Sequence, residues 1–254
     1  MIALATILSL LKLVDLPYGG SITPASMLPI LIIAYRYGTG WGILTATVHG
    51  ALQFILGTSV LSYVTGWKSV CAVIIFDYVL AFALIGLGGI FKNMKNGKAG
   101  LVLGGLTACL ARYLCHFISG VTVWRDISIP GSAAVIYSFS YNATYMIPET
   151  IVLCAAAYYL ASCLNFKAQN LAPIKKSEST SRGILSYIKG AILACTLIFD
   201  VAAVFSKLQD ADTGSFDITG LANVNFPLVL LVSAVGILLF AIFSIIPKIA
   251  RKKS

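Results

Sequence analysis

Six ionisable side chains lie inside long apolar runs of the sequence, where a charge is costly and usually serves a function. They are His49, Asp77, Arg112, His116, Glu149 and Asp200. Carboxylates and imidazoles in such a setting can bind a cation, relay protons or pair with one another. The chain carries no hydrolytic, nucleotide-binding or redox motif. The sequence therefore predicts binding or transport, and not an enzyme.

Three of these groups are expected to have structural roles. Arg112 should pair with helix ends or with Glu149, which follows a proline and can bridge helices. His49 and Gln53 lie four residues apart, which favours hydrogen bonds between helices over ligand binding. Asp200 receives no role from the sequence.

Four other features, on three predicted helices, share one depth in the outer half of a membrane. Asp77 lies about 14 Å along its helix from the outer end, and His116 about 12 Å from the outer end of the next helix. Tyr137 and Asn142 lie about 8–15 Å into the helix that follows. This common depth predicts a single site.

The helix faces agree with this arrangement. His116, Gly120 and Trp124 recur every four residues and so share one helix face. Ser138 and Asn142 are also four residues apart. Gly120 leaves room beside its helix for a flat ligand. The faces of two neighbouring helices therefore point to the same pocket.

This pocket combines an anion, an imidazole, an amide, hydroxyls and aromatic rings. Tyr78 directly follows Asp77, and Trp67 stands at the outer mouth of the same helix. Such chemistry suits a flat, heteroaromatic cation, which rings can stack on and a carboxylate can balance. The competing interpretation is structural: Trp67 and Trp124 as aromatic-belt anchors, and His116 as a packing histidine.

The composition identifies the elements that must position these residues. Of 254 residues, 59% are hydrophobic and 11% charged, and the mean hydropathy is +0.93. An average soluble domain carries about 25% charged residues. These values exclude a soluble enzyme, a disordered protein and a nucleic-acid-binding domain. They predict an all-α, polytopic helical membrane protein, in which cationic loops explain the net charge of +9.

Apolar runs between helix breakers predict eight spans. We expect them at residues 1–14, 25–37, 40–57, 68–91, 99–124, 132–164, 184–206 and 224–247. The first is short, and we expect that helix to begin before Met1. The predicted organisation is a six-helix substrate-binding membrane domain (1–166), a polar cytoplasmic linker (167–183) and a two-helix C-terminal membrane unit (184–254). Lys and Arg concentrate in alternate loops, which predicts that both termini are cytoplasmic.

Four stretches, which follow one another in this order along the chain, carry a family resemblance: LPYGGSITPASMLPI (16–30), FDYVLAFALIGLGGIF (76–91), ARYLCHFISGVTVW (111–124) and YSFSYNATYMIPE (137–149). Through them, residues 1 to about 164 resemble the thiamine-specific S components of bacterial energy-coupling factor (ECF) transporters. The resemblance implies a subunit of the bacterial cell membrane that captures thiamine from outside. It also implies partners: a membrane coupling protein and two cytoplasmic ATPases.

The resemblance assigns roles to individual residues. Asp77 becomes the counter-charge, at a position where the family commonly has Glu. Trp67 and Trp124 would stack on rings. The full set of implied substrate-binding residues is Trp67, Asp77, Tyr78, His116, Gly120, Trp124, Tyr137, Ser138 and Asn142. No metal or cofactor is implied. Gly20 replaces a family Trp, and residues 184–254 lie outside the family pattern.

Two other functions remain open at this point. One is an ion-gradient-driven carrier of small solutes, with Asp77, Glu149 and Asp200 as proton sites. The other is a membrane scaffold subunit without a ligand. Among thiamine compounds, the free vitamin is favoured over its phosphate esters, because only Lys68 and Arg125 lie near the outer mouth.

Overall fold

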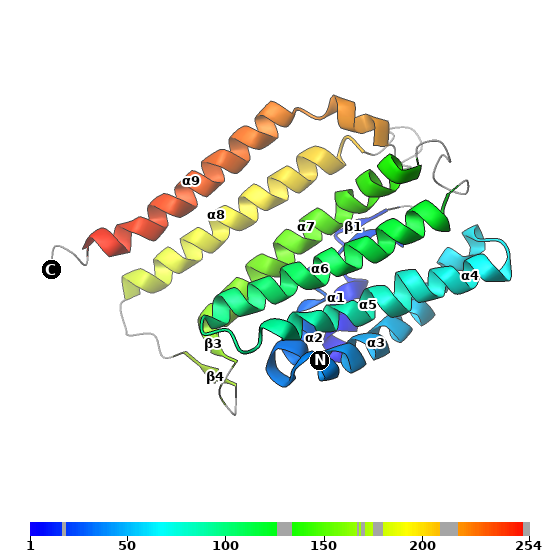
Figure 1. The fold of residues 1–254 in the computed structure, drawn as a ribbon. Coiled ribbons are helices and arrows are strands. Elements are labelled where there is room, and N and C mark those ends of the chain that lie inside the picture. The colour runs from blue at the N-terminus through cyan, green and yellow to red at the C-terminus, as the bar shows by residue number, and fades with distance from the viewer. Residues whose placement is uncertain are drawn as a thin grey trace. The chain divides into compact units, whose positions relative to one another are not determined.

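A computed structural model shows how the chain folds (Figure 1). It describes residues 1–16, 19–125, 134–166, 168, 171–174, 180–208 and 218–250. These form two compact units, Met1–Ile174 and Lys175–Ser254.

The first unit opens with a helix and a small hairpin. Helix α1 (Ile2–Leu10) leads into strand β1 (Val14–Asp15), which pairs antiparallel with β2 (Ser21–Ile22). The predicted first span of 1–14 is therefore too long, because the chain leaves the helix at Leu11. Residues 11–16 include Lys12 and Asp15, which carry charge away from an apolar helix. Helices α2 (Leu28–Tyr37) and α3 (Thr39–Leu56) follow, then the 3-10 helix η2 (Thr58–Tyr63).

The second half of this unit consists of three long rods. The first joins α4 (Trp67–Val73), the π-helical η3 (Ile74–Leu80), α5 (Ala81–Ala83) and the 3-10 helix η4 (Leu84–Phe91). The next two are α6 (Gly97–Thr122) and α7 (Ala134–Cys163), which pack against each other. Strands β3 (Leu164–Asn165) and β4 (Ala172–Pro173) pair after α7.

The second unit contains α8 (Thr180–Phe205), the 3-10 helix η6 (Ile218–Asn223) and α9 (Phe226–Ala250). Helices α8 and α9 pack against each other. The Asp200 carboxylate of α8 accepts a hydrogen bond of 2.7 Å from the Ser233 hydroxyl of α9. A polar residue for which the sequence suggested no role thus links two apolar helices.

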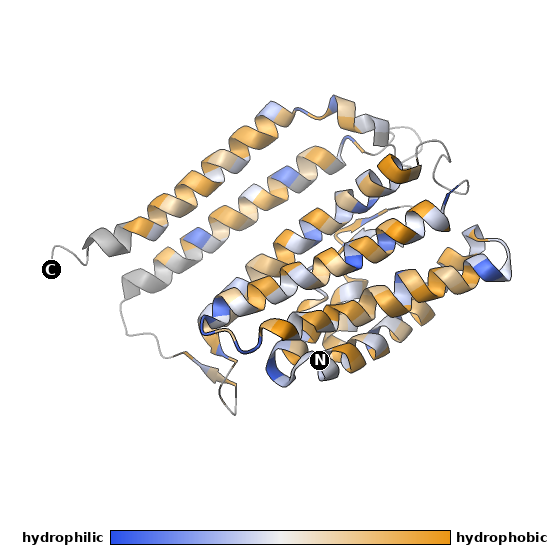
Figure 2. Ribbon diagram, viewed as in Figure 1, coloured by the Kyte–Doolittle hydropathy of each residue, from blue (hydrophilic) through white to orange (hydrophobic). Residues whose placement is uncertain are grey.

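Four helical segments in the described residues are long and apolar enough to cross a membrane. They are Trp67–Phe91, Gly97–Thr122, Ala134–Cys163 and Phe226–Ile245. In Figure 2, much of the ribbon of these segments has the orange of hydrophobic residues. The chain is thus a multi-pass helical membrane protein, as predicted. The number of C-terminal spans is not confirmed, because α9 alone in its unit meets both criteria within the described residues.

Glycines bring the helices of the first unit into backbone contact at one end. A methyl group on Gly42 of α3 would lie 2.9 Å from the Cα atom of Gly86 in η4. A methyl group on Gly104 of α6 would lie 2.6 Å from the carbonyl oxygen of Gly88. Small residues permit such close approach between membrane helices. The helices are therefore closely packed around these glycines, and the cavity around Asp77 lies toward the other ends of the same helices.

Candidate functional site

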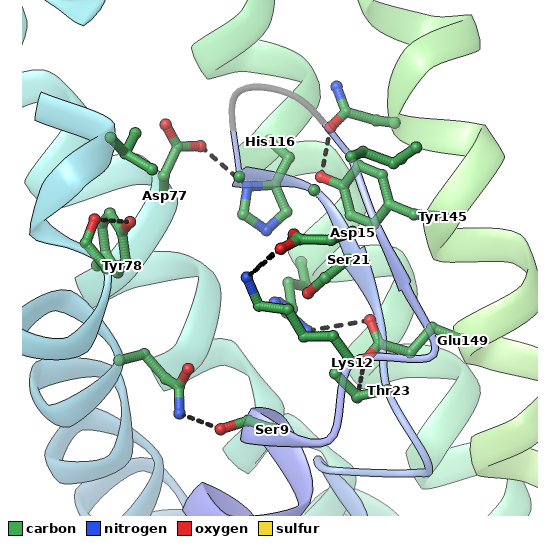
Figure 3. Close-up of a pocket in the computed structure, with 18 of the residues that line it drawn as sticks. Ser9, Lys12, Asp15, Ser21, Thr23, Asp77, Tyr78, His116, Tyr145 and Glu149 are labelled. Atoms are coloured by element: carbon green, nitrogen blue, oxygen red, sulfur yellow. Dashed lines mark hydrogen bonds and ion pairs between the residues drawn. The ribbon is translucent and has the colours of Figure 1, made fainter. Parts of the chain in front are cut away.

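A cavity of about 470 Å³ lies inside the first unit. Residues of α3, η3, α6 and α7 line it, and the β1–β2 hairpin with the end of α1 contributes further residues (Figure 3). Both apolar and polar side chains reach it. Since it contains carboxylates, cations and aromatic rings, it can recognise both the charge and the flat faces of a ligand.

The Asp77 carboxylate has three hydrogen-bond partners in this cavity. Its Oδ1 atom lies 2.9 Å from Nδ1 of His116. Its Oδ2 atom accepts hydrogen bonds from the Ser119 hydroxyl at 2.7 Å and from the Trp124 indole nitrogen at 3.2 Å. The Asp77 side chain is only 14% exposed. Several donors directed at one carboxylate fix its orientation.

His116 retains a hydrogen-bonding atom for a ligand. Its Nδ1 atom faces Asp77, whereas its Nε2 atom is buried and has no hydrogen-bond partner among the described residues. With a proton on Nδ1, the neutral ring presents Nε2 as an acceptor. The cavity therefore contains a buried imidazole nitrogen without a partner among the described residues, beside a carboxylate.

The rod around Asp77 departs from regular α-helix. Residues Ile74–Leu80 form the π-helix η3, a geometry that is rare and often marks functional sites. Both Asp77 and the next residue, Tyr78, reach the cavity. The Tyr78 hydroxyl donates to the Gly57 carbonyl at 3.2 Å, which ties η3 to the end of α3. The wide turn thus directs two successive polar side chains inward.

Helix α6 presents the face that its spacing predicted. His116 and Gly120 line the cavity, as does Trp124 just beyond the helix. Trp124 is 7% exposed and packs with Val64 and Val73. Such burial does not fit an aromatic-belt anchor, the structural alternative for this residue.

Helix α7 contributes an ordered polar chain. The Tyr145 hydroxyl donates to Oδ1 of Asn142 at 2.6 Å, and Nδ2 of Asn142 donates to the Ser138 carbonyl at 2.8 Å. The Tyr145 ring lies edge-on to His116, with 6.2 Å between ring centroids. Asn142 therefore orients an aromatic ring that stands beside the imidazole.

Of the nine site residues expected from the sequence, seven line the cavity: Asp77, Tyr78, His116, Gly120, Trp124, Tyr137 and Asn142. The structure places the other two outside its lining. Ser138 is fully buried and donates to the Phe117 carbonyl at 3.0 Å. Trp67 is 73% exposed, and the Lys68 ammonium lies 5.9 Å from its ring centroid.

Sequence reasoning missed the contribution of the hairpin. Lys12 and Asp15 form an ion pair of 2.8 Å that lines the cavity (Figure 3). Gly20 lies so close to α7 that a methyl group there would be 2.9 Å from the Tyr141 hydroxyl and 3.0 Å from the Tyr145 ring. The signal available was the Gly19–Gly20 pair between two short segments, which is typical of a hairpin turn.

Glu149 lines the same cavity but is engaged within the protein. Its Oε1 atom accepts from the Thr23 hydroxyl at 2.7 Å, and its Oε2 atom lies 3.5 Å from Nη1 of Arg112. The Arg112 guanidinium also lies over the Phe82 ring, 4.5 Å from its centroid. The expected pairing of Arg112 with Glu149 is confirmed, and it connects α6 with α7.

The first helix is tied to α3 by the polar residues that were expected to join helices. The Thr6 hydroxyl lies 3.3 Å from Nδ1 of His49. The Gln53 amide donates to the Ser9 hydroxyl at 2.6 Å. Within the part of the chain that the structure describes, no group of three or more His, Cys, Asp or Glu residues could hold a metal ion.

Comparison with known proteins identifies the family of the chain. The family described as thiamine transporter protein matches residues 1–169. The thiamine transporter ThiT of Bacillus subtilis (strain 168) is 32% identical over 178 residues, which cover 65% of this chain and 86% of that protein. The solved structure of ThiT from Listeria monocytogenes matches with a TM-score of 0.53 and 22% identity, over 63% of this chain and 88% of that one. The last match supports the fold alone. The family consists of transporters and not of enzymes, and this chain belongs to it.

Proposed function

We propose that this protein is the substrate-binding subunit of an ECF-type transporter and that it binds thiamine in the cavity around Asp77. The observation that carries the proposal is a buried carboxylate, fixed by three donors, in a cavity lined by aromatic rings. Thiamine is a flat heteroaromatic cation, which such a cavity suits. The names of the family and of its relative from Bacillus subtilis support the same ligand.

In this proposal each group has a definite task. Asp77 balances the positive charge of the thiazolium ring. Trp124 and Tyr137 supply ring faces for stacking, and Nε2 of His116 accepts a hydrogen bond from the aminopyrimidine amino group. Asn142 holds Tyr145 in place. Trp67 is omitted, because its exposed side chain does not line the cavity.

Free thiamine remains the preferred ligand over its phosphate esters. Lys12 adds a cation to the cavity lining that the sequence did not indicate, but Asp15 neutralises it at 2.8 Å. Arg112 is likewise paired with Glu149. A phosphate entering the cavity would have to compete with these carboxylates for the two cations, and would face their repulsion.

The proposed direction of capture follows from the charges of the loops. The excess of Lys and Arg in alternate loops supports a cytoplasmic position for both termini, and the helix ends near Asp77 would then face the outside. Thiamine then enters from outside, past the β1–β2 hairpin. The sequence has no nucleotide-binding motif, and we assign the energy source to a membrane coupling protein with two cytoplasmic ATPases.

A binding experiment tests the ligand directly. The full chain, purified in detergent, is titrated with thiamine by isothermal titration calorimetry, with the pyrimidine precursor and thiamine monophosphate as competitors. We expect saturable binding with thiamine as the tightest ligand. Mass spectrometry of small molecules that co-purify provides an independent readout. A chain that binds none of these compounds would contradict the proposal.

The partnership needs its own test. Co-expression with a coupling protein and two ATPases should yield a complex that co-purifies and supports thiamine uptake. Uptake that persists without the ATPases and collapses with an uncoupler would instead indicate an ion-gradient carrier.

A further inference from the structure

A second cavity, of about 410 Å³, lies at the glycine-packed end of the first unit. The C-terminal end of α2, the turn after η4 and the residues after β3 line it. The thiamine cavity lies toward the other ends of the same rods, since Asp77 precedes η4 and His116 lies late in α6. The two cavities are therefore separate, and the second has no part in the function proposed above.

The lining of this second cavity is basic and rich in donors. It includes the Arg36 guanidinium, the Lys92 ammonium and the Asn93 amide. Among the described residues that line it there is no carboxylate. The Lys92 ammonium lies against the turn between α2 and α3, where a methyl group on Gly38 would be 3.1 Å from it. Cations from two segments thus converge on one opening.

Tyr35 is a buried polar residue of the same cavity. Its side chain also lines the cavity, and the residue is only 3% exposed. Its hydroxyl oxygen is buried and has no hydrogen-bond partner among the described residues. A buried hydroxyl without a partner is costly, and an acceptor on a ligand in the cavity would satisfy it.

Helix ends and membrane topology can explain the cations of this cavity, but not the buried Tyr35 hydroxyl. Cations in the last turn of a helix interact favourably with its C-terminal carbonyls, and Arg36 lies in the last turn of α2. Loops on the cytoplasmic side also accumulate Lys and Arg. Neither effect explains an unpaired buried hydroxyl, nor the cavity between these groups.

The geometry points to a phosphate-binding site formed by Tyr35, Arg36, Lys92 and Asn93. Guanidinium and ammonium groups bind phosphate oxygens, and the amide and phenol add neutral donors. The phosphate can come from an anionic phospholipid headgroup, since the site lies at the end of membrane helices, or from free phosphate. The exposed Tyr37 at its rim suits the membrane interface.

The test compares the two sources on the full chain. In one arm, thermal unfolding is measured in detergent with added phosphatidylglycerol or with phosphatidylcholine. In the other arm, inorganic phosphate is titrated against chloride at equal ionic strength. A stabilisation by phosphatidylglycerol alone identifies the lipid. A saturable stabilisation by inorganic phosphate, without a lipid preference, identifies free phosphate.

Variants assign the effect to the site. Lys92→Gln and Arg36→Gln should each lower the apparent affinity about fivefold, and Tyr35→Phe should weaken it without changing the charge. The matched control is Lys95→Gln, an exposed lysine of the same turn that does not line the cavity. Thiamine binding at the other end of the bundle verifies that each variant is folded. No stabilisation in either arm, or equal losses in Lys95→Gln and Lys92→Gln, would overturn the proposal.

Discussion

Of the three carboxylates that line the cavity, Asp77 and Glu149 are largely buried, and their surroundings differ in a way that separates ligand recognition from structural support. Asp77 is held by His116, Ser119 and Trp124, of which only the histidine could carry a charge. Glu149 lies 3.5 Å from the permanently charged guanidinium of Arg112. The charge of Glu149 is therefore neutralised within the protein, whereas that of Asp77 remains available to a cationic ligand.

The comparison explains why one acid can serve a ligand and the other cannot. Neutral donors orient a carboxylate and lower the cost of burying it, but they leave its net charge in place. A guanidinium removes that charge and also fixes the two helices that carry the pair. We expect substitutions around Asp77 to change affinity, and those around Glu149 to change stability.

The largest expected effect comes from Asp77→Asn. It keeps the shape of the side chain and removes the charge that balances thiamine. By analogy with buried ion pairs, the loss should be about 3–5 kcal/mol, or roughly two to four orders of magnitude in Kd. Isothermal titration calorimetry measures it. The matched control is Asp15→Asn, whose exposed carboxylate pairs with Lys12 and whose loss should matter far less. Equal losses in both variants would contradict the role of Asp77.

Glu149→Gln should show the opposite behaviour. It leaves the Arg112 guanidinium buried without its anionic partner, which should lower the free energy of unfolding by about 2–3 kcal/mol. Its Kd for thiamine should change far less than that of Asp77→Asn, because the Glu149 carboxylate is engaged by Arg112 and Thr23. Thermal unfolding and calorimetry on the same preparation separate the two effects. A loss of affinity as large as that of Asp77→Asn would contradict the proposal that Asp77 serves the ligand and Glu149 the stability of the fold.

Trp124→Phe removes one of the three hydrogen-bond partners of Asp77 and should have a smaller effect. The variant keeps an aromatic ring but loses the indole hydrogen bond of 3.2 Å. A hydrogen bond to a charged group contributes about 1.5–3 kcal/mol, and two donors to Asp77 remain. We therefore expect affinity to fall about tenfold, measured by calorimetry. Trp41→Phe, an exposed residue of α3, is the control. An unchanged Kd would show that the orientation of Asp77 does not depend on Trp124.

Thr23→Val is the corresponding change beside Glu149 and should have the smallest effect. Valine preserves the shape of the side chain and removes the hydroxyl that lies 2.7 Å from Glu149. Arg112 still holds the carboxylate, so we expect a loss of about 1 kcal/mol in unfolding free energy. Thermal unfolding reports it, and thiamine affinity should stay within about twofold. A larger fall in affinity than Trp124→Phe produces would reverse the proposed division of roles.

Helix geometry made much of the cavity predictable from the sequence. A helix rises about 1.5 Å per residue, so counting from the helix ends placed Asp77 and His116 at one depth, and they lie 2.9 Å apart. The four-residue spacing of Gly120 and Trp124 from His116 was equally informative. Ser119, three residues after His116, lies within the reach of the same periodicity and was overlooked.

Other parts of the site could not be read from periodicity. Strands β1 and β2 have two residues each, which is too short to show an alternating pattern. The position of Lys12 and Asp15 in the cavity depends on how that hairpin folds back. The exposure of Trp67 was equally hidden, since it depends on what packs around the start of α4 and not on the residue type.

The π-helical turn around Asp77 makes this span sensitive to insertions and deletions. Removing one residue from Ile74–Leu80 could restore regular helix and leave a rod that is still long enough to cross the membrane. The same deletion would remove the wide turn that directs both Asp77 and Tyr78 into the cavity. In the history of this gene, a single lost codon could therefore abolish vitamin recognition while leaving a hydropathy profile almost unchanged.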